Sequence, residues 1–211
     1  MSKDIEKRFF DGLEVRMAGD GKSRVIEGYG IVFNKRFHLY GEFHEEIAPE
    51  SGDYFRSDSA KMKDKRDTIS AYNHNFEKVL GRVSANTLRF EVDEIGVKYI
   101  VDVPPTSYGD DLLVSIGRGD IKGSSFVFRV GKYEVMEEND LTIRRITEFD
   151  VVAEMGPVTN PAYTDTTVAK RSLDNFKKEK EAVTVVKRST YKSRTNSARV
   201  AYCKMLLNLN K

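Results

Sequence analysis

The sequence predicts a mainly β protein: a closed or nearly closed antiparallel β-barrel with a few surrounding helices. Short segments that alternate apolar and polar residues recur along the chain, and turns rich in Gly and Asp separate them. The sequence therefore predicts about seven or eight strands and only one or two helices. Many strands joined by tight turns, with few helices to cover a sheet, favour an antiparallel barrel.

Two strand pairs come first. Residues 13–17 ("LEVRM") and 24–33 ("RVIEGYGIVF") flank "AGDGKS", which supplies the Gly and Asp that a turn needs. A clearer hairpin spans residues 86–104, with Gly96 at its turn. Its alternating apolar positions are Leu88, Phe90 and Val92 on one strand, and Val97, Tyr99, Val101 and Val103 on the other.

One convincing helix is predicted in the body, over residues 107–118. Thr106 or Ser107 can cap it, and two aspartates lie in the first turn, where the helix dipole favours anions. An apolar stripe follows at helical spacing, and "GRGDIKG" ends the helix. The residues of the first turn and the stripe are Asp110, Asp111, Leu112, Leu113 and Ile116.

The second half of the body is predicted to be mostly strands. They are residues 124–130, 132–136, 141–155 and 156–163. By contrast, residues 44–68 ("HEEIAPESGDYFRSDSAKMKDKRDT") are polar and rich in charge, which predicts a surface loop or a short surface helix.

Charge divides the chain into two parts. From Lys170 onward twelve lysines and arginines face three acidic residues, a net charge of +9, which leaves −7 for residues 1–169 of a chain whose total is +2. We therefore expect a β-barrel domain over residues 1–171 and a basic, flexible tail over 172–211. Solvation is the simplest role for such a tail, and binding of nucleic acid is an alternative.

The cellular setting follows from what the sequence lacks. A lone Cys203 cannot form an internal disulfide, there is no signal peptide, and the longest apolar runs are a few residues. We expect a protein of the cytoplasm without a transmembrane segment. Common signatures for nucleotides, dinucleotides and zinc are missing, so no cofactor and no metal are expected. His38 and His44 stand beside Glu45 and Glu46, but no third spaced ligand accompanies them.

His74, in "YNHNFEKVLGRV", is open to three interpretations: a working base, a metal ligand, or a polar residue at the end of a strand. Ser125 is a candidate partner. In "IKGSSFVFRV" the strand period places it opposite Phe126 and Phe128, which anchor the strand in the core. A histidine of ordinary pKa can activate such a hydroxyl. The alternative is that Ser124 and Ser125 are plain hydroxyls at a strand edge.

An imidazole that acts as a base needs an orienting acceptor. Glu148, Asp150 and Glu154 lie on the late strands that would border Ser125. Asp150 and Glu154 fall in the otherwise apolar run "FDVVAEM", where a buried carboxylate needs a hydrogen-bonding or charged partner. Histidine would serve, and the residues alone leave the choice among these carboxylates open.

Four segments together resemble one family. In order they are "LEVRM…IEGYGIVFN", "NHNFEKVLGRV" followed by "TLRFEVDEIGV", "GDDLLVSIGRGDIKGSSFVFRV", and "EFDVVAEMGPVTNPAYTDTTVAKRS". Over about residues 13 to 172 the chain is similar to the prohead (capsid maturation) serine proteases of tailed bacteriophages, which are related in fold to the herpesvirus assemblins. The resemblance therefore implies a herpesvirus-protease-like barrel.

The resemblance also implies roles for particular residues. His74, before the Leu-Gly-Arg turn, matches the general base, and Ser125 of "GSSFVF" matches the nucleophile. Glu154, just before "GPVTNPAY", matches the third member, with Glu148 as the fallback acid. Backbone amides are expected in the oxyanion hole, with Arg82 or Arg129 in support.

Three departures from the family pattern leave an inactive descendant open. Val127 stands where glycine is usual, Met155-Gly156 stands in place of Val-Ser, and "APESGDYF" replaces a more usual Pro-Gly-Ala-Phe. None of them removes a group that the resemblance makes catalytic.

By the same resemblance the protein is a serine endopeptidase of head maturation. It would cut scaffold, an extension of the major coat protein, and itself, inside the procapsid in the host cytoplasm. The basic tail could dock to scaffold or to the shell interior. A homo-oligomer is open, since herpesvirus relatives are dimers. The alternative is a catalytically inactive capsid-assembly or scaffold-binding protein with a tail that binds nucleic acid or the shell.

Overall fold

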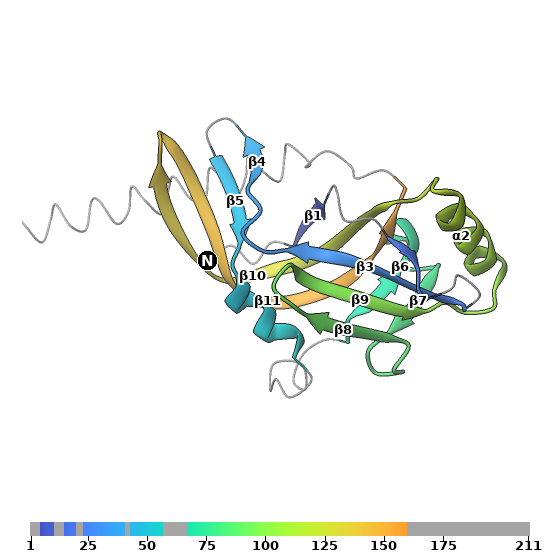
Figure 1. The fold of residues 1–211 in the computed structure, drawn as a ribbon. Coiled ribbons are helices and arrows are strands. Elements are labelled where there is room, and N and C mark those ends of the chain that lie inside the picture. The colour runs from blue at the N-terminus through green and yellow to red at the C-terminus, as the bar shows by residue number, and fades with distance from the viewer. Residues whose placement is uncertain (1–4, 11–14, 20–22, 41–42, 57–66, 160–211) are drawn as a thin grey trace, which may run out of the picture. The chain divides into compact units, whose positions relative to one another are not determined.

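The computed structural model describes residues 5–10, 15–19, 23–40, 43–56 and 67–159 (Figure 1). In chain order its strands are β1 (Glu6–Phe10), β2 (Arg16–Met17), β3 (Val25–Val32), β4 (Phe37–Tyr40), β5 (Phe43–Ile47), β6 (Ile69–Ala71), β7 (Val79–Arg82), β8 (Leu88–Val92), β9 (Gly96–Asp102), β10 (Gly123–Glu138) and β11 (Leu141–Val158). The described helical segments are α2 (Ser107–Arg118) and two short 3-10 helices, η1 (Pro49–Phe55) and η2 (Tyr72–His74).

These strands form two sheets, which confirms a mainly β fold. The seven-stranded sheet has the order β1-β10-β11-β5-β4, with β6 beside β11 and β7 beside β6, and the four-stranded sheet runs β2-β3-β9-β8. Both β5 and β6 pair with β11 in parallel, so the larger sheet is mixed rather than antiparallel. Within the described strands the hydrogen-bonded ladders do not close into one barrel.

The early hairpins and the helix agree with the sequence. β2 pairs with β3 and β8 with β9, both antiparallel, and Gly96 begins β9 as the turn pattern predicts. At the start of α2 the Thr106 side chain accepts a hydrogen bond from the Gly109 N–H. At its end Gly119 adopts a left-handed conformation that a glycine reaches without steric cost.

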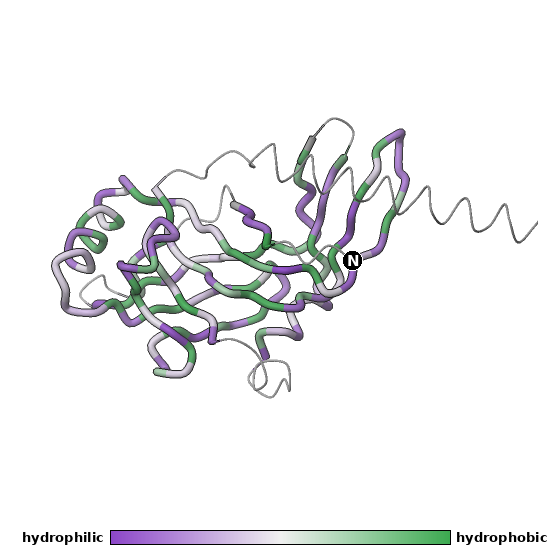
Figure 2. The backbone as a smooth tube through the Cα atoms, turned by 180° about the vertical axis from the view of Figure 1, so that it is seen from behind, coloured by the Kyte–Doolittle hydropathy of each residue, from purple (hydrophilic) through white to green (hydrophobic). Residues whose placement is uncertain are grey.

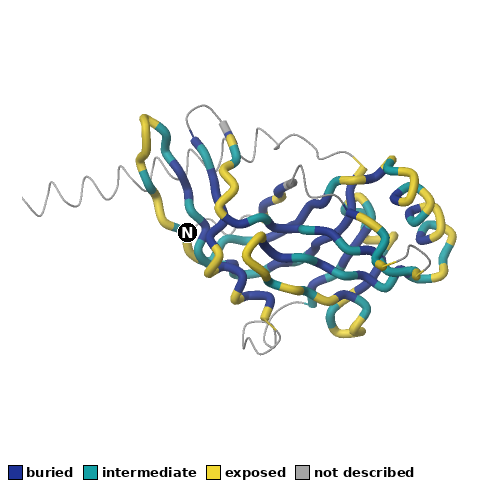
Figure 3. The backbone as a smooth tube through the Cα atoms, viewed as in Figure 1, coloured by how far each residue is buried: buried dark blue, intermediate teal, exposed yellow. Residues whose placement is uncertain are grey.

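Two expected breaks between late strands do not exist. The segments predicted at 124–130 and 132–136 are one strand, β10. Those predicted at 141–155 and 156–163 are continuous in β11 as far as Val158, and residues 160–163 lie outside the described ranges. The β10–β11 register shifts between Val127 and Phe128 and again between Arg129 and Tyr133, so the first expected break falls at a local irregularity of an unbroken strand. The far end of this hairpin lies beside β5, with an exposed outer edge (Figures 1 and 3).

One apolar core draws on both sheets. Apolar and polar positions alternate along the strands (Figure 2), and the buried positions concentrate where the strands of the two sheets contribute to the core (Figure 3). Phe126 and Phe128 stack with centroids 4.5 Å apart, and Phe149 meets both rings edge-on at 5.9 and 5.4 Å. These aromatic contacts hold β10 and β11 rigidly together.

Four charged side chains are buried where β1, β5 and β11 meet. Arg8 donates to Glu45 at 2.6 Å and to Glu6 at 2.5 Å, and Arg144 donates to Glu6 at 2.7 Å and to Glu45 at 2.8 Å. Burial opposes ionisation, but Arg144 and Arg8 hold the pKa of Glu45 below its usual range. The expectation that residues 44–68 form a surface loop is therefore wrong at β5, because paired arginines let a charged strand enter the core.

The remainder of the 44–68 segment is partly helical, since η1 covers Pro49–Phe55 and buries Tyr54 and Phe55. Residues 57–66 lie outside the described ranges, as does the predicted basic tail at 172–211 with Cys203, so the division into two domains stays a prediction. Within the described ranges no helix has the length and apolar character needed to span a bilayer.

Candidate active site

Ser125 lies on β10 and has a neighbouring strand on each side. Its register partners are Phe9 on β1 and Gly156 on β11, so its backbone is held within the sheet. The residue is 0 % exposed. Phe126 and Phe128 fix the strand from the core, as the alternation of the sequence predicts. The hydroxyl is therefore presented from a buried strand that is paired on both sides.

The two adjacent serines have different partners. The Ser124 Oγ lies 3.0 Å from the Tyr99 hydroxyl in the core, and burial raises the pKa of Tyr99 well above its ordinary value. The Ser125 Oγ instead lies 2.8 Å from Nε2 of His74. Both serines are buried, but only the second of them is hydrogen-bonded to a ring nitrogen that can accept a proton.

His74 ends η2, directly after the short strand β6. Asn73 and His74 both have a positive φ, at 55° and 57°. This left-handed region is uncommon for residues other than glycine and costs about 1 kcal/mol or more per residue. The turn is closed by backbone hydrogen bonds from the Asn75 N–H to the Tyr72 carbonyl (3.0 Å) and from the Tyr72 N–H to the Lys78 carbonyl (3.2 Å). Strain of this kind is typical of functional sites.

Both ring nitrogens of His74 are engaged. Nε2 faces the Ser125 hydroxyl at 2.8 Å, and Nδ1 lies 2.5 Å from Oε2 of Glu154. Since an ionised carboxylate can only accept, Nδ1 carries the proton and Nε2 is left to accept from Ser125. The His74 side chain is 13 % exposed, whereas that of Glu154 is 0 % exposed. The ring is thus the accessible member of a buried chain of three groups.

Glu154 lies on β11 and also contacts the strand that leads to His74. Its Oε1 accepts from the Ala71 N–H at 3.3 Å. Burial raises the pKa of Glu154, and the hydrogen bonds and charge of His74 only partly offset this effect. The carboxyl group therefore takes up a proton at a higher pH than an ordinary glutamate.

The two residues after Glu154 account for one of the three departures from the family pattern. A Cβ built on Gly156 would lie 2.7 Å from the Ala71 carbonyl oxygen and 2.8 Å from Ser70 Oγ, so the glycine lets β6 lie directly against β11. Met155 is fully buried and fills the space that Gly30 leaves, where a Cβ would lie 2.2 Å from its sulfur. Met155 and Gly156 are therefore accommodated by this chain's own packing.

The other predicted site residues have partners elsewhere. Glu148 accepts from Lys132 at 2.8 Å, so the fallback acid is paired across the hairpin, six residues along β11 from Glu154. Arg129 donates to Asp150 at 2.5 Å, and Arg82 lies 3.4 Å from Asp67. A role for either arginine in the oxyanion hole stays a prediction.

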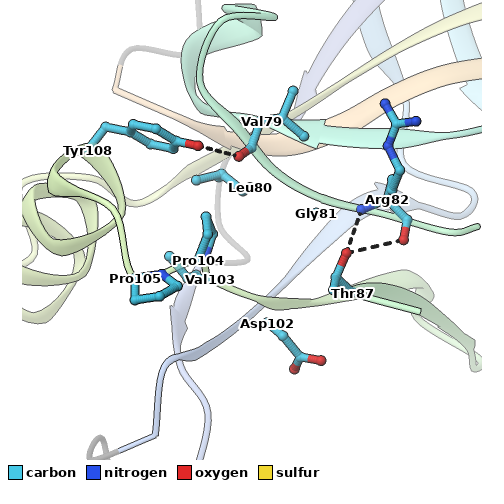
Figure 4. A pocket seen from close by; sticks show the side chains of 10 residues that line it. All are labelled: Val79, Leu80, Gly81, Arg82, Thr87, Asp102, Val103, Pro104, Pro105 and Tyr108. Carbon is cyan, nitrogen blue, oxygen red and sulfur yellow. Dashed lines mark hydrogen bonds between the residues drawn. The ribbon is translucent and has the colours of Figure 1, made fainter. Parts of the chain in front are cut away.

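The Leu-Gly-Arg segment forms one wall of a pocket of about 500 Å³ (Figure 4). The other walls are supplied by Thr87, by residues 102–105 at the end of β9 and just after it, and by Tyr108 in the first turn of α2. The Tyr108 hydroxyl donates to the Val79 carbonyl at 2.9 Å. Thr87 Oγ1 accepts from the Arg82 N–H at 3.0 Å. β7 is thereby tied to α2 and to Thr87, the residue before β8, which supports the β6–β7 pair that flanks the His74 turn.

The remaining histidines do not join this site. His38 and His44 face each other across β4 and β5, with ring centroids 5.2 Å apart. Across the described ranges, no three His, Cys, Asp or Glu side chains are arranged to hold a metal ion.

Two residues that sequence reasoning missed secure the His74 turn. The Asn73 side chain accepts from the Thr159 N–H at 2.8 Å and donates to Thr159 Oγ1 at 3.0 Å. The Tyr72 hydroxyl lies 2.9 Å from the same Oγ1. The available signal was the asparagine beside His74, because asparagine is enriched in the left-handed region. Its partner is 86 residues away, a distance that no local pattern spans.

A hydroxyl, an imidazole and a carboxylate joined in this order can perform nucleophilic catalysis. The imidazole can take the hydroxyl proton as the oxygen attacks, and the carboxylate stabilises the imidazolium that results. Ser125, His74 and Glu154 are also the three residues to which the resemblance of the sequence to prohead proteases assigns these roles.

Comparison with known proteins agrees with this chemistry. A family model described as caudovirus prohead serine protease matches residues 11–179, which is most of the chain. No curated protein and no solved structure gives a significant match.

Proposed function

Because this chain belongs to the caudovirus prohead serine protease family, and is therefore a serine protease of phage head maturation, we propose that Ser125, His74 and Glu154 are its catalytic triad. The observation that supports the assignment is the pair of contacts on opposite nitrogens of one ring, 2.8 Å to Ser125 Oγ and 2.5 Å to Glu154 Oε2. The two oxygens come from different strands, and the histidine comes from a strained turn between them.

In the proposed mechanism His74 Nε2 takes the proton of Ser125 as its oxygen bonds to the carbonyl carbon of the scissile peptide. Glu154 keeps the other ring proton on Nδ1 and stabilises the imidazolium. When the tetrahedral intermediate collapses, the C–N bond breaks and His74 returns the proton to the leaving amine. Water, activated by the same ring, then releases the acyl group from Ser125.

The developing oxyanion needs donors, since one preorganised donor contributes on the order of 3 kcal/mol to such a reaction. We infer that backbone amides supply them, with Arg82 or Arg129 in support through water. The ion pairs of these two side chains would have to open or reorient to do so directly, so the backbone is the better candidate.

The substrates follow from the family role. We propose that the enzyme enters the procapsid and cuts scaffold, an extension of the coat protein and itself, with the basic segment from residue 172 as a docking element. The +9 charge of residues 170–211 supports this last point, because it offers an acidic partner a long-range attraction. Nucleic acid is the alternative partner for the same charge.

The test is cleavage by the purified full chain of its scaffold and coat proteins. Ser125→Ala should lower the rate by about 10⁶-fold while leaving the protein folded. Ser124→Ala is the matched control: it removes the neighbouring hydroxyl, leaves the Tyr99 hydroxyl unpaired, and should keep cleavage with some loss of stability. Full activity of Ser125→Ala would refute the assignment.

A second measurement separates an active enzyme from an inactive capsid-assembly protein. A fluorophosphonate probe should bond to Ser125 Oγ with loss of fluoride, and intact-mass analysis should find one adduct on the wild-type chain. His74→Ala should abolish labelling, since the hydroxyl then has no base. A wild-type chain that binds scaffold but is neither labelled nor able to cut would favour the binding protein.

A further inference from the structure

Apart from the His74 ring itself, two side chains hold the Tyr72–His74 turn to the rest of the site. Backbone hydrogen bonds close the turn upon itself, from Asn75 to Tyr72 and from Lys78 to Asn75, but these bonds do not attach it to β11. The attachment comes from the Tyr72 hydroxyl, 2.9 Å from Thr159 Oγ1, and from Asn73, whose amide makes two hydrogen bonds to Thr159, to its N–H at 2.8 Å and to its Oγ1 at 3.0 Å. Asn73 therefore binds Thr159, the residue after β11, at both a backbone atom and a side-chain atom.

The strand that anchors the turn also carries the acid. Glu154 orients the His74 ring through Nδ1, and Thr159, five residues further along the chain, holds Asn73. Both the His74 ring and the backbone of its turn are therefore held by residues 154–159. Ser125 lies on the adjacent strand, paired with β11 through Gly156, so any movement of the turn relative to β11 changes the distance from Nε2 to Ser125 Oγ directly.

Asn73 is suited to this place for two separate reasons. Its φ of 55° lies in the region that asparagine tolerates better than most residues. Its amide also has the acceptor and the donor that the N–H and hydroxyl of Thr159 require. A glycine would meet the first need and not the second, which makes the two contributions separable by mutation.

We infer that Asn73, through Thr159, is a positioning residue that keeps the imidazole of His74 within reach of Ser125. The inference rests on the proposed function for the role of His74. It assigns no contact with substrate to Asn73. We call the two Asn73–Thr159 hydrogen bonds the clamp. Since Asn73 positions His74 and does not contact substrate, loss of the clamp should slow the chemical step rather than weaken binding. A small displacement of a reacting group can cost up to about 10²-fold in rate.

The experiment uses the full chain with four changes at two positions. Asn73→Gly keeps the left-handed backbone and removes the amide, and Asn73→Ala removes both. Thr159→Val removes the hydroxyl but keeps the N–H, while Thr159→Ser keeps both groups. Each variant is assayed for kcat and KM on a peptide substrate and for the rate of fluorophosphonate labelling, well below its unfolding temperature.

We expect Asn73→Gly to lower kcat and the labelling rate at least tenfold with KM within about twofold of wild type. Asn73→Ala should be as slow or slower. Thr159→Val should lose a few-fold, because it removes the hydroxyl that both Asn73 and Tyr72 contact, and Thr159→Ser should resemble wild type. An Asn73→Gly enzyme with wild-type kcat would overturn the inference, because tolerance of the backbone conformation would then be the whole role of Asn73.

A readout independent of activity completes the test. The Nδ1 proton that His74 shares with Glu154 should give a low-field NMR signal, assigned among only three histidines by its loss in His74→Gln. Asn73→Gly should broaden or remove this signal, and Thr159→Ser should keep it; an unchanged signal in Asn73→Gly would count against the clamp. Failure of the wild-type chain to label at Ser125 would instead refute the proposed function, and the NMR result would still decide the clamp.

Discussion

Replacing Gly156 with alanine should damage both the stability and the activity of this protease. The new Cβ would lie 2.7 Å from the Ala71 carbonyl oxygen, whereas an ordinary contact begins at 3.4 Å, so β6 would have to retreat by about 0.7 Å. Retreat breaks the 3.3 Å hydrogen bond from the Ala71 N–H to Glu154 and carries the His74 turn away from Ser125. Overpacking of this kind costs about 1–3 kcal/mol, and a displacement approaching 1 Å in a catalytic group costs up to about 10²-fold in rate.

The assay pairs urea unfolding with peptide cleavage, and the matched control is Gly117→Ala. Gly117 lies in α2 with nothing within 4 Å of its built Cβ, so the same substitution there should stabilise the protein by up to about 1 kcal/mol and leave kcat unchanged. We expect Gly156→Ala to lose about 1–3 kcal/mol and 10- to 100-fold in kcat. A Gly156→Ala enzyme with wild-type kcat and an unchanged unfolding midpoint would show that β6 does not depend on this close approach.

Three further changes have defined outcomes. Glu154→Gln should lower kcat by about 10⁴-fold, because the amide can donate to Nδ1 and leave His74 in the wrong tautomer. This loss is smaller than the one expected for Ser125→Ala. A loss under tenfold would point to another acid. Since burial raises the pKa of Glu154, activity should fall as the pH drops through a value above that of an ordinary glutamate. The stability contributed by the neutral carboxyl is present below the ordinary value and lost as the pH rises through the raised one, so Glu154→Gln should flatten this part of a stability–pH curve. Arg8→Met removes a buried partner of Glu45 and should lower the free energy of unfolding in urea by about 3–5 kcal/mol. The control is Arg118→Met, at an ion pair whose arginine is 72 % exposed, which should cost about 0–1 kcal/mol. Equal losses would contradict the role of burial.

Local patterns predicted the parts of the fold that local interactions determine. α2 has its cap, its acidic first turn and its apolar stripe close together in the sequence, and its predicted range is the observed one. The hairpin predicted over residues 86–104 contains β8 and β9, which begin and end two residues inside it. β6 and β7 have only three and four residues, which is too few repeats of the two-residue strand period to detect. β5 was missed because its Glu45 looks like a surface residue until arginines from β1 and β11 neutralise it.

The site shows the same limit. Ser125 could be separated from Ser124 by strand alternation, because the phenylalanines that follow define which face is the core. The choice between Glu148 and Glu154 could not, since they are six residues apart and an unbroken strand would place both on one face. The register shifts in β10–β11 and the contact of β6 with β11 distinguish them, and both depend on tertiary pairing.

The buried charges at β1 limit how far the amino terminus could be trimmed. β1 is the outer neighbour of the strand that carries Ser125, with Phe9 in register with Ser125, and Glu6 and Arg8 anchor it to β5 and β11. A cut before Glu6 leaves all four charges and the strand pairing intact. A cut after Glu6 removes one carboxylate from a neutral cluster, and a cut beyond Arg8 exposes the edge of the strand that carries Ser125. Glu6 therefore marks the point past which trimming from the amino terminus would end the enzyme's own activity.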